Sequence, residues 1–366
     1  MNARMPDLAS LAQQWDGATD DTLVCRHVRQ ETADVKTFLF AAPAARTMRY
    51  WPGQYLTLEL DIDGVRVNRC YTLSSTPTRP DMVSITVKRV PGGLVSNWLH
   101  DNLQVGASVR VLGPGGEFSC FLQAPPAAGK YLFLSAGSGV TPLMSMARAL
   151  HDLSFDADIA FVHSARTPAD IIFARELELL AHNQRRFRLG LVCERRGDAA
   201  AWAGFTGYLS RAVLEHIAPD LAQREVFCCG PAPYMAAVRA LLQEAGFDMA
   251  HYHQESFAFE TLEADGASQP AAPVAAEAAP GFTVKFERLG SEVACGGGQT
   301  ILEAARAAGM RLPVSCTKGM CGTCKTRMLS GQVDMRHAGG IRQREIDQGW
   351  ILPCCSRPLS DVTLER

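Results

Sequence analysis

The sequence of 366 residues lacks a long apolar run. A membrane-spanning helix needs about 18 consecutive apolar residues, and no stretch of the sequence approaches that length. The first residues, MNARMPDLASLAQQWDG, also lack the apolar core of a secretory signal. Lysine and arginine number 36 and aspartate and glutamate 38, and a net charge of -2 gives no indication of a nucleic-acid or membrane-surface partner. We therefore expect a soluble cytoplasmic protein.

A disulfide framework is also a poor interpretation of the 12 cysteines, because the chain is long and carries no secretory signal. A zinc site would normally show two short Cys pairs, and only one is present. The spacing of four cysteines instead matches the plant-type [2Fe–2S] pattern, which predicts these metal ligands: Cys316, Cys321, Cys324 and Cys354. Cys355 is an alternative to Cys354, which the spacing favours. Gly319 and Gly322 would let the backbone approach the inorganic sulfides.

Composition and periodicity divide the chain into four parts. Residues 1–125 contain short alternating segments between Gly and Pro turns, which predicts an antiparallel β-barrel or sandwich. Residues 126–258 alternate apolar strands with helical patterns, which predicts an α/β domain with a parallel sheet. Residues 259–281 are rich in alanine and proline and predict a flexible linker. Residues 282–366 form a small domain with the clustered cysteines; they resemble a plant-type ferredoxin domain, and the resemblance implies a β-grasp fold.

Three motifs in the first part occur in the order typical of one flavin domain. They are Arg69-Cys-Tyr-Thr72, the loop Gly92-Gly-Leu-Val-Ser-Asn-Trp-Leu99, and Gly113-Pro-Gly-Gly-Glu-Phe118. Together they resemble the ferredoxin–NADP reductase superfamily. The resemblance implies a flavin phosphate on Arg69, a ring packed along Tyr71, and a Thr72 hydroxyl near the reactive flavin nitrogen. It further implies FAD rather than FMN, and the remaining contacts Leu73, Ser74, Gly93, Leu94, Val95 and Ser96.

The α/β part carries the nicotinamide motifs of the same superfamily. A strand runs into Gly137-Ser-Gly-Val-Thr-Pro142, which departs from G-x-G-x-x-G but resembles the superfamily's G-x-G-x-x-P loop. The C-G-P motif implies that Cys229 lies beside the nicotinamide, with Glu255 and Phe257 near the flavin. The implied cofactor contacts in this part are Gly137, Ser138, Gly139, Thr141, Pro142, Arg166, Gly230 and Pro231, and the implied catalytic residues are Thr72, Cys229 and Glu255.

Two interpretations in this part stay open. His251, His253 and Glu255 alternate along one predicted strand and could form a metal triad, although the superfamily resemblance explains the segment without a metal. Arg166 could contact the 2′-phosphate of NADPH or a phosphate common to both nicotinamides. We expect NADH, with NADPH possible.

The three motif sets are complementary, because a nicotinamide delivers two electrons together, a cluster accepts one, and a flavin converts between them. The domain order resembles the reductase subunits of glycine betaine monooxygenase and similar Rieske-type oxygenase systems. It implies NAD(P)H as substrate and a Rieske-type oxygenase as the protein acceptor. Residues 282–366 carry 12 basic and 8 acidic residues, a formal +4 that predicts a partner face of opposite charge.

Three alternatives concern the acceptor. A self-sufficient oxygenase is disfavoured, because Cys25-Arg-His27 is one half of a Rieske site and no C-x2-H half occurs. The reductase of a hybrid-cluster protein would have similar domains. A non-enzymatic iron–sulfur redox sensor would not need the flavin and nicotinamide motifs.

Overall fold

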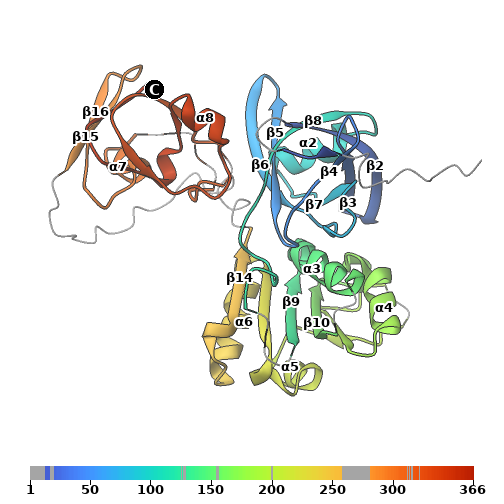
Figure 1. Cartoon of the computed structure of the whole chain (residues 1–366). Helices are drawn as coiled ribbons and strands as arrows, with labels where there is room; N and C mark the ends of the chain where they lie inside the picture. Colours follow the sequence, from blue (N-terminus) through green and yellow to red (C-terminus); the bar gives the residue numbers. More distant parts are fainter. Residues whose placement is uncertain are drawn as a thin grey trace, which may run out of the picture.

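The computed structural model describes residues 13–16, 20–124, 126, 129–153, 156–198, 201–257, 281–310, 312, 314, 316–320 and 322–366. These residues form three bodies, a β-barrel, an α/β domain and a C-terminal domain (Figure 1). Residues 258–280, which hold almost all of the predicted linker, lie outside the described residues, as does the predicted ligand Cys321. No described helix has the length and apolar content that crossing a membrane requires.

The β-barrel consists of six antiparallel strands in the order β6-β5-β8-β2-β3-β7, which confirms the predicted architecture. A bridge between Leu73 and Ile85 joins the two edge strands and closes the sheet around a buried apolar core. The motif from Arg69 to Thr72 forms the end of strand β6. The elements are β1 (Gln13–Gln14), β2 (Thr22–Thr32), β3 (Val35–Ala41), β4 (Arg46–Thr47), β5 (Tyr55–Ile62), β6 (Val65–Thr72), β7 (Val83–Lys88), α2 (Leu94–Asn102) and β8 (Ser108–Gly115).

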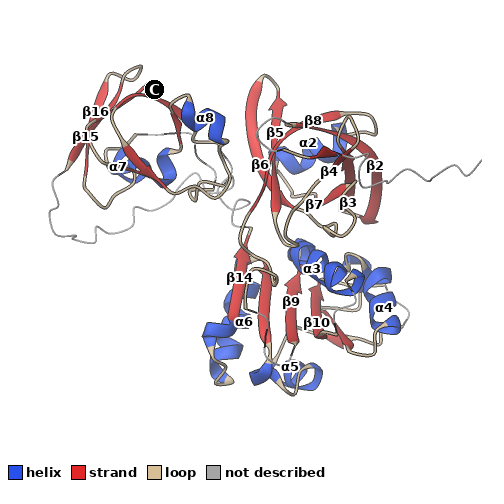
Figure 2. Ribbon diagram, in the orientation of Figure 1, coloured by secondary structure: helices blue, strands red, loops and turns tan. Residues whose placement is uncertain are grey.

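The α/β domain contains a parallel six-stranded sheet in the order β12-β11-β10-β9-β13-β14, as predicted (Figure 2). Helices α3 and α4 pack on one face and α5 and α6 on the other, each burying apolar side chains against the strands. The elements are β9 (Lys130–Ala136), α3 (Val140–Asp152), β10 (Asp158–Ala165), α4 (Ala174–Asn183), β11 (Phe187–Cys193), β12 (Phe205–Thr206), α5 (Arg211–Ile217), β13 (Glu225–Gly230), α6 (Ala232–Glu244) and β14 (Tyr252–Ser256).

The C-terminal domain has a mixed five-stranded sheet in the order β16-β15-β21-β17-β19, with helix α7 packed on the same apolar core. This arrangement agrees with the predicted β-grasp fold. A capping box at Thr300 and Glu303 starts α7. The elements are β15 (Phe282–Phe286), β16 (Ser291–Cys295), α7 (Ile301–Ala307), β17 (Thr326–Ser330), β18 (Val333–Met335), α8 (Gln343–Asp347), β19 (Trp350–Ile351), β20 (Ser356–Pro358) and β21 (Val362–Leu364).

Candidate functional site

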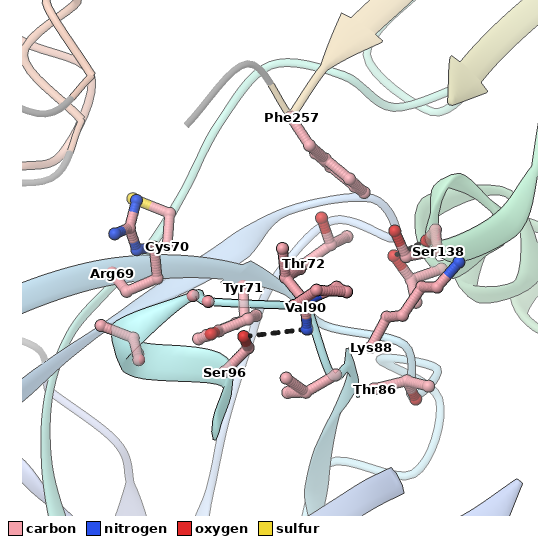
Figure 3. Close-up of a pocket in the computed structure, with 16 residues that line it drawn as sticks. Arg69, Cys70, Tyr71, Thr72, Thr86, Lys88, Val90, Ser96, Ser138 and Phe257 are labelled. Atoms are coloured by element: carbon pink, nitrogen blue, oxygen red, sulfur yellow. Dashed lines mark hydrogen bonds between the residues drawn. The ribbon is translucent and has the colours of Figure 1, made fainter. Parts of the chain in front are cut away.

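A cavity of about 280 Å³ runs along the end of strand β6 and the start of helix α2 (Figure 3). Phe257, which follows β14 of the α/β domain, projects over Thr72 toward Ser138, so both domains contribute to the wall. Nine residues singled out from the sequence line it: Arg69, Tyr71, Thr72, Gly93, Val95, Ser96, Ser138, Thr141 and Phe257.

The start of helix α2 has the features of an anion site. Gly92 adopts a φ of 73°, which a side chain would strain, and both Gly92 and Gly93 line the cavity. The Ser96 hydroxyl accepts a hydrogen bond from the Val90 backbone N–H at 3.1 Å, which holds the loop to the first turn of the helix. The free N–H groups and the positive end of the helix dipole suit a phosphate group.

Three predicted contacts lie outside this cavity. Leu73 is fully buried in the barrel core, and its backbone N–H is donated to the Gln54 carbonyl. The Ser74 hydroxyl is buried in a network with Ser84 and Thr86. Leu94 is 47% exposed at the helix start, on the side away from the cavity lining.

A second cavity, of about 450 Å³, lies at the carboxyl ends of the parallel strands, where the barrel meets the α/β domain. Such strand ends are the usual ligand-binding edge of an open α/β sheet. Three predicted residues line it: Gly137, Arg166 and Pro231. Sequence analysis missed several others, among them Asp34, Lys88, Asp170, Glu194 and Tyr234.

Arg166 is held by carboxylates in this second cavity. Its guanidinium lies 3.1 Å from the Asp34 carboxylate of the barrel and 2.9 Å from that of Asp170. Glu194 lines the same cavity. Arg166 is therefore already paired before any ligand enters. The negative charges of Asp34, Asp170 and Glu194 disfavour the binding of a phosphate group in this cavity.

The glycines of the nicotinamide motifs permit close packing between the two strand ends. A Cβ on Gly139 would lie 2.2 Å from the Cys229 carbonyl oxygen and 2.6 Å from the Gly230 nitrogen. Only glycine fits there, so the α3 start can approach β13. Pro142 sits in the first turn of α3, where a missing N–H costs no hydrogen bond.

Cys229 and Glu255 lie side by side on β13 and β14 and line neither cavity. Cys229 is fully buried, whereas Glu255 is half-buried with its Oε2 atom shielded from solvent. Burial raises the pKa of Glu255 to about 8. Its Oε2 atom has no hydrogen-bond partner among the described residues. Burial, followed by the nearby Glu255 carboxyl, raises the pKa of the Cys229 thiol well above its usual value, so this cysteine stays a thiol.

The two histidines before Glu255 do not converge on it. The His251 and His253 rings lie 2.9 and 2.5 Å from the two carboxylate oxygens of Glu225 on β13. His251 precedes β14, within a short 3-10 turn, so the expected alternation on one strand does not hold there. Among the described residues, no group of three or more His, Cys, Asp or Glu side chains could hold a metal ion.

The described cysteines of the predicted cluster loop nevertheless come together. The sulfur atoms of Cys324 and Cys354 are 3.3 Å apart. The Met320 backbone N–H points at the Cys316 sulfur at 3.2 Å, and that of Gly319 at the Cys354 sulfur at 3.3 Å. Amide donors aimed at thiolate sulfurs are the surroundings that stabilise an iron–sulfur centre, so the described part of the loop fits the cluster.

Positive φ angles shape this loop. Thr317, Gly319 and Gly322 have φ values of 56°, 69° and 70°. A Cβ on Gly319 would lie 2.7 Å from the Cys355 sulfur, and one on Gly322 would lie 2.5 Å from the Gly340 carbonyl oxygen. The glycines therefore let the loop pack against residues 337–340 while its N–H groups turn toward the sulfurs.

Comparison with known proteins gives a match for each body. The family model of the oxidoreductase FAD-binding domain matches residues 23–120, that of the oxidoreductase NAD-binding domain residues 133–240, and that of the 2Fe-2S iron-sulfur cluster binding domain residues 284–359. The glycine betaine monooxygenase reductase subunit of Pseudomonas aeruginosa is 47% identical, over 93% of this chain and 94% of the relative. The chain belongs to the family of reductase components of oxygenase systems.

Two further matches support this assignment. The stachydrine N-demethylase reductase subunit Stc4 of Rhizobium meliloti is 40% identical over 96% of this chain and 97% of the relative. The structure of phthalate dioxygenase reductase matches with a TM-score of 0.55 and 26% identity, covering 95% of this chain and 98% of that one. As an oxygenase reductase component, the chain combines an FAD domain, an NAD domain and a ferredoxin domain.

Proposed function

We propose that this chain is the NADH-dependent reductase of a Rieske-type oxygenase that demethylates an N-methyl amine such as glycine betaine. One observation carries most weight: strands β5 and β6 bring the first cavity and the cluster loop together, and Lys88 of β7 lines both the first cavity and the second. Arg69 and Thr72 line the first cavity, and Thr57, paired with Cys70 of β6, donates a hydrogen bond to the Met320 carbonyl of the cluster loop. The names of the relatives at 47% and 40% identity supply the class of oxygenase.

The first cavity suits FAD, which accepts two electrons as hydride and releases them one at a time. The Arg69 guanidinium would pair with a phosphate, and the start of α2 at Gly93 would hold the pyrophosphate. Tyr71 would support the ring, and the Thr72 hydroxyl would donate to it. Phe257 covers the opposite side and would move aside for the nicotinamide.

The second cavity suits NADH better than NADPH. Asp34 and Asp170 neutralise Arg166, and Glu194 adds a further negative charge. A 2′-phosphate would have to displace a carboxylate from Arg166 and lie beside the others, which costs free energy that a ribose hydroxyl does not. Cys229 and Glu255 would act from beneath the nicotinamide, Cys229 by positioning it and Glu255 by holding a proton.

Cys316, Cys321, Cys324 and Cys354 would hold the [2Fe–2S] cluster, which transfers single electrons. The buried Cys354 lies 3.3 Å from Cys324 and accepts an N–H group from Gly319, whereas the neighbouring Cys355 contacts the Leu352 carbonyl. These contacts favour Cys354 over Cys355 as the fourth ligand.

The test is reconstitution with the oxygenase component of a glycine betaine monooxygenase. We expect NADH oxidation to depend on glycine betaine, with one formaldehyde released for each NADH consumed. The same assay with NADPH should be much slower. NADH oxidation without formaldehyde, under conditions where the chain reduces ferricyanide normally, would contradict the proposed acceptor.

A further inference from the structure

The ferredoxin domain rests on the outer face of barrel strands β5, β6 and β8. The Tyr55 hydroxyl donates to the Ala338 carbonyl at 2.5 Å, and the Thr57 hydroxyl to the Met320 carbonyl at 3.2 Å. Figure 1 shows α8 on the side nearest the barrel and β15 and β16 on the far side. The face that touches the barrel therefore includes the cluster-binding loop itself.

Charges of alternating sign cross this contact. Arg342, at the start of α8, lies 3.5 Å from Glu59 of β5, and Arg344 lies 3.9 Å from Asp21. Arg110 on β8 lies between the two carboxylates, 3.5 Å from Glu59 and 3.6 Å from Asp21. The ferredoxin domain thus contributes Arg342 and Arg344 to the contact, and the barrel contributes the carboxylates that pair with them.

Arg342 is buried in the contact but only partly satisfied. Its side chain is 5% exposed, and one guanidinium nitrogen donates to the Val111 carbonyl at 2.8 Å. Its Nε atom and the Oε2 atom of Glu59 have no hydrogen-bond partner among the described residues. Burying charges without full hydrogen bonding costs much of what their attraction gains, so the pair selects an orientation without holding it tightly.

The apolar cores do not bridge the contact either. Among the described residues, the ferredoxin core cluster contains no barrel residue. Since the contact is polar and weakly satisfied, the ferredoxin domain can leave the barrel without exposing a core. While it is docked, however, the Met320 side of the cluster loop lies against the barrel, and a protein acceptor cannot reach the loop from that side.

We propose that the Arg342–Arg344 face is a single docking face used in alternation, first by the acidic barrel site of Glu59 and Asp21 and then by an acidic site on the oxygenase. This rests on the proposed function, because the oxygenase is the second occupant. The barrel carboxylates indicate what the site on the oxygenase should contain, namely two carboxylates spaced to pair with Arg342 and Arg344. Electron delivery then requires release of the domain from the barrel.

A disulfide can lock the docked arrangement. A Cβ on Gly115 would lie 3.7 Å from the Gly339 Cα, and a Cβ on Gly339 would lie 3.5 Å from the Gly115 Cα. This separation suits a disulfide between Gly115→Cys and Gly339→Cys. Because Gly339 has a φ of 93°, the single variant Gly339→Cys is the matched control for backbone strain.

We expect the full-length double variant to form the disulfide in air, as mass spectrometry without reductant detects, and to give a narrower small-angle scattering distance distribution. NADH should still reduce its cluster, while anaerobic reduction of cytochrome c should fall about tenfold or more and recover with dithiothreitol. Failure of the disulfide to form in folded protein, or an unchanged rate of cytochrome c reduction after it forms, would overturn the single-face proposal.

The charge of the second occupant is tested with one acceptor in two forms, cytochrome c and its succinylated derivative, in which lysines have become carboxylates. We expect the native chain to reduce the acidic form about tenfold faster at low ionic strength. Arg342→Glu with Arg344→Glu should bring that ratio close to one. Arg288→Glu is the control, since Arg288 is 73% exposed and pairs with Glu365.

An unchanged ratio in the double variant would overturn the assignment of this face. The chain without a cluster, Cys324→Ser, gives the background of direct reduction by the flavin. If NADH failed to reduce the cluster in the native chain, the proposed function would fail. The disulfide yield and the scattering profile test the docking face and do not depend on that reduction. The two proposals can therefore be contradicted independently.

Discussion

The barrel meets its two neighbours through interfaces of different kinds. Toward the α/β domain the apolar core is continuous, because Val35 of the barrel belongs to the same cluster as Phe133 and Phe227. Toward the ferredoxin domain the contact is polar, and the Nε atom of its central arginine, Arg342, has no hydrogen-bond partner in the described part of the chain. We infer from this difference that the barrel and the α/β domain form one permanent frame, and we propose that the ferredoxin domain can detach from it.

Two buried arginines show the contrast at the level of single side chains. Arg148 of α3 donates to both Glu176 oxygens, at 2.7 and 2.6 Å, and also to the Ser74 carbonyl of the barrel. Burial alone would raise the pKa of Glu176, but the hydrogen bonds and charge of Arg148 outweigh it and leave that pKa lowered. Arg342 has a single hydrogen bond to the barrel and an ion pair at 3.5 Å.

The largest expected effect comes from removing a cluster ligand, which should stop electron transfer through the ferredoxin domain and leave the barrel and the α/β domain active. Cys324→Ser should prevent cluster assembly and lower the rate of cytochrome c reduction by about a hundredfold or more, because the single-electron path is lost. NADH-dependent ferricyanide reduction, which needs only the barrel and the α/β domain, should stay near the native rate. Cys295→Ser is the control, since this buried cysteine of the same domain lies outside the cluster loop and contacts the Gln299 carbonyl. Equal losses in both variants would contradict the assignment.

The next prediction concerns Glu255, which lies beside Cys229. Burial raises the pKa of Glu255 from 4.5 to about 8, so the folded chain keeps a proton that the unfolded chain releases. The free energy of unfolding should therefore fall as the pH rises from about 4.5 to 8, by an amount of order a few kcal/mol.

Glu255→Gln should remove this slope and be the more stable protein at pH 8. Urea unfolding at several pH values between about 5 and 9 measures it. Identical slopes in the native chain and the variant would show that Glu255 is already ionised in the folded state.

A third prediction compares the two arginines directly. Arg148→Met should lower the free energy of unfolding by about 1–2 kcal/mol, because the Ser74 carbonyl loses a donor and the partly exposed Glu176 loses its ion pair. Arg342→Met should change it by less than about 0.5 kcal/mol, because detachment of the ferredoxin domain lets Glu59 become solvated. Guanidinium unfolding followed by circular dichroism measures both. Comparable losses would mean that the ferredoxin contact is as permanent as the other interface.

The smallest expected effect is on nicotinamide choice. Asp34→Asn removes one carboxylate from Arg166 and should raise kcat/KM for NADPH by about three- to tenfold, with little change for NADH. Asp156→Asn is the control, because Asp156 pairs with Arg186 and is 84% exposed. A proportional change for both nicotinamides would show that Arg166 contacts a group that they share.

Much of this organisation could be predicted from the sequence, because its signals are local. The alternating strands of the barrel, the strand–helix alternation that follows and the spacing of the cluster cysteines all depend on residues close in the chain. The segment 169–182 shows the limit of such signals, because its sequence has a helical pattern throughout but the helix does not span it. The helix begins only at Ala174, because residues 168–170 form a 3-10 turn and Phe173 takes a φ of 60°.

The remaining features depend on contacts between distant residues. Asp34 reaches Arg166 only because a barrel hairpin lies over the edge of the parallel sheet, and Glu59 meets Arg342 across a domain boundary. A single sequence carries no signal for either pair. Motif resemblance also named whole stretches, whereas the structure turns Leu73 and Ser74 into the barrel and leaves Tyr71 and Thr72 on the cavity.

The central claim is that the barrel and the α/β domain accept electrons in pairs from NADH and pass them one at a time to the ferredoxin domain. An anaerobic NADH titration of the purified protein, followed by absorbance and electron paramagnetic resonance, tests it most directly. The account predicts flavin bleaching together with the rhombic signal of a reduced [2Fe–2S] cluster, and about three electrons stored per chain. Flavin bleaching without a cluster signal in iron-replete protein would contradict it.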